Sequence, residues 1–460
     1  MIRDKINEII SERILILDGA MGSMISVYGL SEDDFRGVRF HDHGKPLKGC
    51  NDLLCLTRPE IIAGIHEAYL EAGADIIETC SLNSSAIGLD EFGLGKYARE
   101  ISRASAILAR EAADKFSAEG RPRFVAGSIG PTAKSASLTR DIDNPGNRLI
   151  TFDELETSYY ENAAGLAEGG CDFMLIETAY DGLNAKAAIA AILRLSGELG
   201  RDIPVVVSAT VTETGRLITG QSIEQFCEAM LHAKPLALGL NCSFGAEKLL
   251  GALEAVSAMV PCPVCFYPNA GLPDAHGHYA DTPGIMASLL RSCMKNGLVN
   301  IVGGCCGSTP DHIRAISEIS VGHKPRAFSR DTNLFFPAKN DFETVPWQKA
   351  MDIGDYEGAV EIANAENEKT SGLNMIILSA DRAPDPAGTL KNFIFLSSSF
   401  SALASLPVLI ESADFEVIRE AVKCVQGRCF ARLYGGARGI QFREKYNELL
   451  ALGAGLIDIP

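Results

Sequence analysis

Two adjacent cysteines in a glycine-rich segment are the residues whose types and spacing point most clearly to chemistry. Cys305 and Cys306 lie within the segment Gly303–Gly307, and Cys242 follows a separate short apolar run. Three cysteine thiolates without a fourth protein ligand are typical of a zinc site that keeps one coordination position open. The glycines would let the backbone turn tightly enough to direct two successive sulfurs at one ion. The alternative interpretation is that these are ordinary small buried residues, as free cysteines often are.

The elements that would position these cysteines are short apolar runs, each followed by a helical stretch. Short, β-branched and nearly continuous runs are typical of strands buried on both faces of a parallel sheet. Eight such units over about 300 residues predict an α/β chain with a closed (β/α)₈ barrel, and an open doubly wound sheet is the alternative. The eight runs are Ile14–Leu17, Ala74–Glu78, Phe124–Ser128, Phe173–Glu177, Val205–Ser208, Ala237–Leu240, Val264–Tyr267 and Ile301–Gly303.

Small and polar residues gather directly after these runs and not before them. Asp18 follows the first run, Glu177 ends the fourth, and Cys242 and the Cys305–Cys306 pair follow the sixth and eighth. In parallel α/β architectures the carboxyl ends of the strands carry the functional site. The pattern therefore predicts a pocket at one mouth of the barrel.

Composition and charge exclude several classes of function. The chain has 460 residues and a net charge of −17, so we expect two domains and neither nucleic acid nor an anionic membrane surface as a partner. No run approaches the roughly 18 apolar residues of a membrane helix, and the charged amino terminus does not resemble a secretory signal. We therefore expect a cytoplasmic protein, in which clustered cysteines indicate metal or thiol chemistry rather than disulfides.

The periodicity breaks near residue 320, and a shorter α/β region follows. We assign residues 1–320 to the barrel, 321–340 to a linker and 341–460 to a smaller domain of about half the length of a closed barrel. The exposed sheet edges of a half-barrel need covering, so we expect this region either to pack on the first domain or to form a homodimer through residues 341–460. The expected elements are a helix at Pro346–Lys369, strands at Met375–Leu378 and Pro407–Ile410, a helix at Phe415–Val425 and a last apolar run at Gly455–Ile459.

Several segments of the first part resemble the homocysteine S-methyltransferase family, and are most similar to the homocysteine module of cobalamin-dependent methionine synthases. The resemblance covers about residues 10–315 almost without a gap. The segments that carry it include LDGAMGSMI (17–25), IETAYDGLNAKAA (176–188), GLNCSFGAE (239–247), YPNAGLP (267–273) and GGCCGSTPDHI (303–313).

The resemblance implies a (β/α)₈ barrel with zinc held by Cys242, Cys305 and Cys306. The sulfur of homocysteine would take the open zinc position, where the metal's charge favours thiolate over thiol at neutral pH. Zinc would then act as a template and as a generator of the nucleophile, without redox chemistry.

The resemblance also assigns residues to the remainder of the substrate. Asp18 and Glu177 fit the family's contacts to the substrate ammonium, and Asn269 fits a residue near or on the metal when substrate is absent. One departure is Cys80, which stands where the family commonly has asparagine; we expect it to fill space and do not count it as a zinc ligand. Backbone amides are expected to receive the substrate carboxylate at Gly19, Ala20, Met21, Gly22 and Ser23.

The second part resembles the start of the pterin-binding barrel of methionine synthase, with the polar residues that would face folate replaced. The replacements fall at 378–381, 411–413 and 431–433. We therefore do not expect folate to bind here. The chain also contains no Asp-x-His-x-x-Gly stretch of the kind that would ligate cobalt in a corrinoid module.

From these features we expect zinc-dependent methyl transfer to the thiol of homocysteine, giving methionine. The expected donor is methylcobalamin on a separate corrinoid protein, because the resemblance is greatest to the cobalamin-dependent enzyme. A second possibility keeps the enzyme class and takes the methyl from a small sulfonium such as S-methylmethionine. A third changes the class to a non-catalytic thiol-binding or zinc-binding protein, or an assembly subunit.

Overall fold

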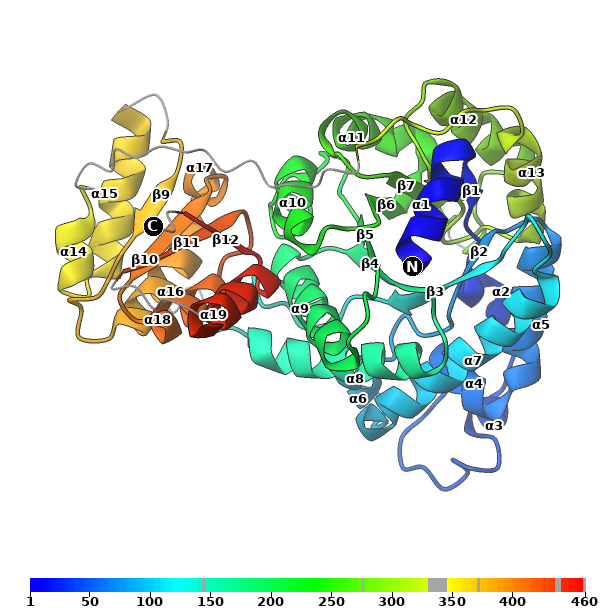
Figure 1. Ribbon diagram of the computed structural model, residues 1–460. Coiled ribbons are helices and arrows are strands. Elements are labelled where there is room, and N and C mark those ends of the chain that lie inside the picture. The colour runs from blue at the N-terminus through cyan, green and yellow to red at the C-terminus, as the bar shows by residue number, and fades with distance from the viewer. Residues whose placement is uncertain are drawn as a thin grey trace.

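The computed structural model describes residues 1–139, 141, 146–274, 277–329, 346–369, 373–434 and 440–457. Its larger part is an eight-stranded parallel sheet in the order β1-β8-β7-β6-β5-β4-β3-β2. A parallel bridge between Leu17 and Ile76 joins the two outer strands, so the sheet closes into the predicted (β/α)₈ barrel (Figure 1). The strands are β1 (Leu15–Ile16), β2 (Ile76–Glu78), β3 (Phe124–Ile129), β4 (Phe173–Ala179), β5 (Val205–Ala209), β6 (Ala237–Gly245), β7 (Val264–Asn269) and β8 (Ile301–Val302).

Helices surround the barrel and close its amino end. In α1 (Ile2–Glu12), the buried Ile6 and Ile10 pack into the same apolar cluster as inward-facing residues of the strands. Local sequence sets the helix starts: α8 begins at a capping box in which the side chains of Thr151 and Glu154 each accept the other's backbone N–H. The remaining helices are α2 (Met21–Val27), α3 (Glu32–Arg36), α4 (Leu54–Thr57), α5 (Pro59–Glu71), α6 (Ala86–Asp90), α7 (Ala98–Phe116), α8 (Phe152–Glu168), α9 (Gly182–Leu199), α10 (Ile223–Met230), α11 (Ala246–Met259), α12 (Pro283–Lys295) and α13 (Pro310–Ser320), with short 3₁₀ turns η1 (Asn51–Leu53), η2 (Gly95–Tyr97) and η3 (Leu231–Ala233).

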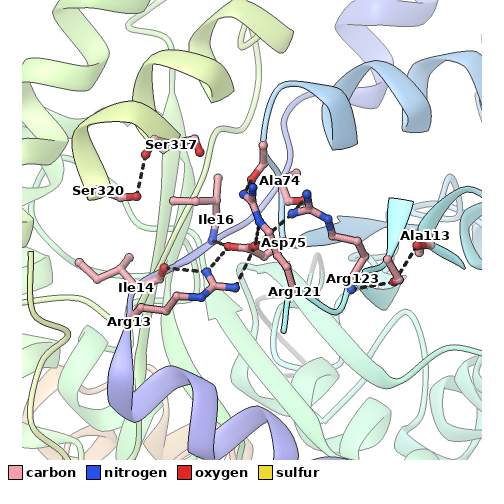
Figure 2. Close-up of polar contacts among 12 residues, drawn as sticks. Arg13, Ile14, Ile16, Ala74, Asp75, Ala113, Arg121, Arg123, Ser317 and Ser320 are labelled. Atoms are coloured by element: carbon pink, nitrogen blue, oxygen red, sulfur yellow. Dashed lines mark hydrogen bonds and ion pairs between the residues drawn. The ribbon is translucent and has the colours of Figure 1, made fainter. Parts of the chain in front are cut away.

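A buried ion cluster ties the amino ends of β1, β2 and β3 together. Asp75 is fully buried, and the guanidinium groups of Arg13, Arg121 and Arg123 converge on its carboxylate (Figure 2). The same carboxylate accepts the backbone N–H of Ile16 at 3.1 Å. Because these residues precede the strands, the cluster lies at the end of the barrel opposite to Cys242 and the Cys305–Cys306 pair, where charged groups serve stability.

The second region is a four-stranded parallel sheet in the order β12-β11-β10-β9. The predicted helix at Pro346–Lys369 is two helices, because the chain turns at Gly354 with a φ of 79°. Of the predicted linker, residues 330–340 lie outside the described part, while Arg326 donates to three barrel carbonyls. The elements are α14 (Gln348–Asp352), α15 (Tyr356–Lys369), β9 (Ile376–Leu378), α16 (Pro386–Ser397), α17 (Ser401–Ala404), β10 (Val408–Ser412), α18 (Phe415–Val422), β11 (Cys429–Leu433), α19 (Ile440–Ala451) and β12 (Ala454–Leu456).

The second region packs against α9 and η3 of the barrel through α19, which lies beside α9 in Figure 1. The fully buried Lys186 of α9 donates to the carbonyls of Val425 at 2.9 Å and Gly427 at 2.5 Å, in the connection before β11. At the β9 edge, the indole of Trp347 donates to Ile377 at 2.9 Å. The homodimer through residues 341–460 stays a prediction.

No helix among the described residues combines the length and the apolar character that crossing a membrane requires.

We expect acid to destabilise the fold through His66 of α5. This side chain is fully buried, and neither ring nitrogen has a hydrogen-bond partner among the described residues. Burial lowers the pKa of His66 to about 4 from a usual 6.5, so the unfolded chain binds the proton more tightly. Stability present above pH 6.5 is therefore lost as the pH falls toward 4, by about 2–3 kcal/mol at pH 4.5. Urea unfolding of the parent and of His66→Leu at pH 7 and pH 4.5 should show a smaller loss for the variant, and equal losses would contradict this assignment.

Candidate metal and substrate site

Cys242 is held in an unusual backbone conformation at the carboxyl end of β6. Cys242 and Ser243 both have a φ of 61°, in the left-handed region that non-glycine residues rarely adopt. The pairing of β6 with β7 is irregular between Asn241 and Gly245, at the same place. Such strained residues gather at functional sites, where the surrounding structure enforces them.

The other two cysteines lie in a tight turn directly after β8. The backbone N–H of Cys305 donates to Pro268 at 2.8 Å, and Ala270 donates to the carbonyl of Cys306 at 3.0 Å. Glycine is required inside this turn, since a Cβ on Gly304 would lie 2.5 Å from the Cβ of Ser308. The predicted role of the glycines in presenting two successive sulfurs therefore has a steric basis in the structure.

The three sulfurs form the only group of metal-ligating side chains found among the described residues. The Sγ atoms of Cys242, Cys305 and Cys306 all lie within 4.8 Å of one another, and those of Cys242 and Cys306 are 3.9 Å apart. Four sulfur ligands at about 2.3 Å from a tetrahedral zinc would be separated by about 3.8 Å. The cluster therefore has the donor type and the spacing to hold a metal ion, with one position left for another ligand.

The thiols also influence one another's ionisation. Hydrogen bonds with Cys242 and Cys305 lower the pKa of Cys306 to about 3, whereas hydrogen bonds with Cys242 and Cys306 raise the pKa of Cys305. Once one thiol has ionised, charge repulsion within the cluster opposes ionisation of the other two. A divalent cation would remove that repulsion and stabilise all three thiolates.

Buried carboxylates lie at the same mouth of the barrel. Asp18 follows β1 and Glu177 lies in β4, and both are almost fully buried. Burial raises the pKa of Glu177 to about 7, against a hydrogen bond donated by Ser128 that lowers it, and the charge of Cys306 raises it further. Burial likewise raises the pKa of Asp18, and Glu177 adds repulsion. The predicted ammonium contacts thus lie within electrostatic reach of the cysteine cluster.

Glu78, at the end of β2, is a third carboxylate at this mouth, half-buried and with a buried Oε1, that was not among the predicted site residues. Its backbone N–H donates to Asp18 at 3.1 Å, and burial together with repulsion from Glu177 and Asp18 raises the pKa of its side chain. The available signal was its position: Glu78 ends the second apolar run, as Glu177 ends the fourth.

The segment predicted to receive the substrate carboxylate is joined to the cysteine turn. The N–H of Ala20 donates to Ser308 Oγ at 3.2 Å, and the N–H of Gly307 donates to Ser23 Oγ at 3.0 Å. Gly19 lies before the first turn of α2, which begins at Met21 and includes Gly22. The structure therefore brings residues 18–23 beside the Cys305–Cys306 turn.

Asn269 and Cys80 were the remaining residues singled out from the sequence. Asn269 is the last residue of β7, and its buried Oδ1 has no hydrogen-bond partner among the described residues. Cys80 lies apart from the three-cysteine cluster: its Sγ donates to Asn51, and its carbonyl accepts from Cys55.

A mostly apolar basin of about 750 Å³ is lined by Ser243, the residue after Cys242. It is formed by the segments that follow β4 and β5 and by the end of β6, with Tyr180, Ile218 and Phe244 among its lining residues. The basin therefore lies on the side of the barrel where the strands end.

These features define a (β/α)₈ barrel protein that gathers thiols and buried carboxylates at the carboxyl ends of its strands. The family model described as homocysteine S-methyltransferase matches residues 15–320, and the chain belongs to that family. It is a family of enzymes that transfer a methyl group to homocysteine.

Solved structures agree with this fold. The oxidized form of the homocysteine methyltransferase MmuM from Escherichia coli is 24% identical, with a TM-score of 0.51 over 66% of this chain and 95% of that chain. The metallated form of the same protein is 23% identical, with a TM-score of 0.52 over 68% of this chain and 98% of that chain. At these identities the likeness establishes the barrel fold alone.

Proposed function

We propose that this chain is a zinc-dependent homocysteine S-methyltransferase that forms methionine, with residues 1–320 as the catalytic unit and 341–460 as a separate domain. The observation that carries the proposal is the position of the Cys242, Cys305 and Cys306 cluster beside the buried carboxylates Asp18 and Glu177. A thiol and an ammonium on one small molecule would meet complementary groups at this mouth.

Each predicted site residue has a separate role in binding the metal or the substrate. The three cysteines would hold zinc, which when bound lowers the pKa of a thiol at the open position. Asp18 and Glu177 bind and orient the ammonium of the substrate, and the amides of residues 19–23 receive the substrate's carboxylate. Asn269 lies near or on the metal when substrate is absent. In the transfer, the substrate thiol gives up its proton, its sulfur forms the new S–CH₃ bond, and the donor leaves with the electron pair of the bond that breaks.

For the methyl donor we favour methylcobalamin on a separate corrinoid protein. The ground for this choice is the resemblance to the cobalamin-dependent enzyme, and the largely apolar basin of about 750 Å³ lined by Ser243 offers space on the same side of the barrel. The same space admits a small sulfonium such as S-methylmethionine, so the donor is decided by assay.

The test measures zinc, thiol binding and turnover on one preparation. We expect about one zinc per chain, proton release on adding L-homocysteine near neutral pH, and methionine from methylcobalamin. Methionine formed only from S-methylmethionine would overturn the donor. Zinc and homocysteine binding without transfer from either donor would favour a non-catalytic thiol-binding or assembly role, and a chain that binds no zinc would overturn the proposal.

A further inference from the structure

Three carboxylates lie near the carboxyl ends of β1, β2 and β4: those of the buried Asp18 and Glu177 and of the half-buried Glu78. Burial and repulsion from Glu177 raise the pKa of Asp18 and of Glu78, and Asp18 also raises the pKa of Glu78. Their partners are sparse: Asp18 Oδ2 accepts from the backbone N–H of Glu78, and Ser128 donates to Glu177 Oε1. Asp18 Oδ1 and Glu78 Oε1 are buried and have no partner among the described residues.

The charge of this group is not balanced within the described part of the chain. None of the interactions that perturb Asp18, Glu78 or Glu177 comes from a lysine, arginine or histidine. Elsewhere in the barrel a buried carboxylate does have cationic partners, as Asp75 has with Arg13 and Arg123. Unpaired buried carboxylates are costly, so the group favours a cation supplied from outside.

The three carboxylates do not form a metal-ligating group of the kind that the cysteines form. Among the described residues, Cys242, Cys305 and Cys306 are the only group of three such side chains whose ligand atoms all lie within 4.8 Å of one another. An ammonium offers three separate N–H donors, so it can be shared by carboxylates that come from different strands.

We propose that Glu78 is a third ligand of the substrate ammonium and makes the site selective for thiols that carry one. This inference rests on the proposed function and extends it to the substrate class: aminothiols rather than thiols in general. Asp18 and Glu78 each offer an unpartnered oxygen, and Glu177 adds the third carboxylate. With the ammonium bound, the orphan oxygens gain donors and the repulsion among the three groups falls.

The experiment compares thiols that differ only in the ammonium or the carboxylate. Zinc-loaded parent and Glu78→Gln are titrated calorimetrically with L-homocysteine, with 4-mercaptobutyrate, which lacks the ammonium, and with 3-aminopropanethiol, which lacks the carboxylate. The parent should prefer the two aminothiols. Glu78→Gln should bind both of them about 10- to 100-fold more weakly, as expected for loss of a charge-assisted hydrogen bond, and bind 4-mercaptobutyrate within about twofold of the parent.

Asp52→Asn is the matched control. Asp52 is also a buried carboxylate, but its Oδ2 accepts from the N–H of Asn83 at 2.7 Å and from Ser84 Oγ at 3.0 Å, apart from Asp18, Glu78 and Glu177. This variant should keep the parent's ratio of affinities for homocysteine and 4-mercaptobutyrate.

Three results would overturn the inference. If Glu78→Gln binds all three thiols equally more weakly, Glu78 has a structural role. If the variant binds homocysteine as the parent does, Glu78 is not a ligand of the ammonium. If the parent shows no preference for aminothiols, the three carboxylates do not bind an ammonium at all. In each of these three outcomes the parent still binds thiols at the metal, so the proposed function is not contradicted. A parent that binds none of the thiols would instead contradict the proposed function.

Discussion

Cys306→Ala is expected to lose its zinc and, with it, methyl transfer. The variant keeps two sulfurs of a cluster whose Sγ atoms lie within 4.8 Å of one another, and two ligands do not complete a structural or catalytic zinc site. It also removes the thiol whose pKa is lowest, since hydrogen bonds with Cys242 and Cys305 lower the pKa of Cys306. We expect zinc to fall from about one per chain to less than about 0.1, and methionine formation to fall by more than about 1,000-fold.

Metal content by mass spectrometry and methionine by chromatography measure both effects. Cys293→Ala is the control, because Cys293 is a buried thiol of α12 that donates to Leu289 and lies outside the cluster. It should retain zinc and activity. A Cys306→Ala protein that keeps a full equivalent of zinc would show that the metal is bound elsewhere.

Asp75→Asn is expected to have the largest effect on stability, at the opposite end of the barrel. The change leaves Arg123, which is 8% exposed, without the charge that compensates it (Figure 2). Breaking a buried pair from one side costs about 3–5 kcal/mol. Arg13 and Arg121 are 37% and 49% exposed, so solvent screens their share and Arg123 dominates the loss.

Urea unfolding followed by circular dichroism measures this change. The control is Asp202→Asn, which breaks an ion pair with Arg3 in which the two side chains are 38% and 24% exposed, and should cost less than about 1 kcal/mol. Losses of equal size in the two variants would mean that Asp75 does not hold the strand ends together as the structure indicates.

The second domain has its own charged groups at the carboxyl ends of its strands. Ser412 donates to Asp381 at 2.5 Å, and Arg432 forms an ion pair with Glu411 at 2.5 Å. These groups partner one another at the carboxyl ends of the strands, and the absence of folate binding stays a prediction.

The sequence by itself determined the barrel and singled out the three cysteines that the structure brings together. All eight predicted strands are present, because buried parallel strands need continuous apolar runs and this pattern is local. Cys242, Cys305 and Cys306 were also recognisable, since thiols at strand ends in a glycine-rich turn combine a rare residue type with a fixed place in the repeat. The single predicted helix at Pro346–Lys369 was wrong, because one glycine with positive φ interrupts an otherwise helical pattern.

Only the tertiary structure decided which carboxylates act as a group. Glu78 and Asp75 lie three residues apart in one run, yet one faces the cysteine mouth without a cation and the other joins three arginines at the far end. Sequence shows that both are acidic and near a strand. Burial and partners depend on contacts with Asp18 and Glu177, or with Arg13 and Arg123, across large sequence separations, so their electrostatic roles appear only when the barrel closes.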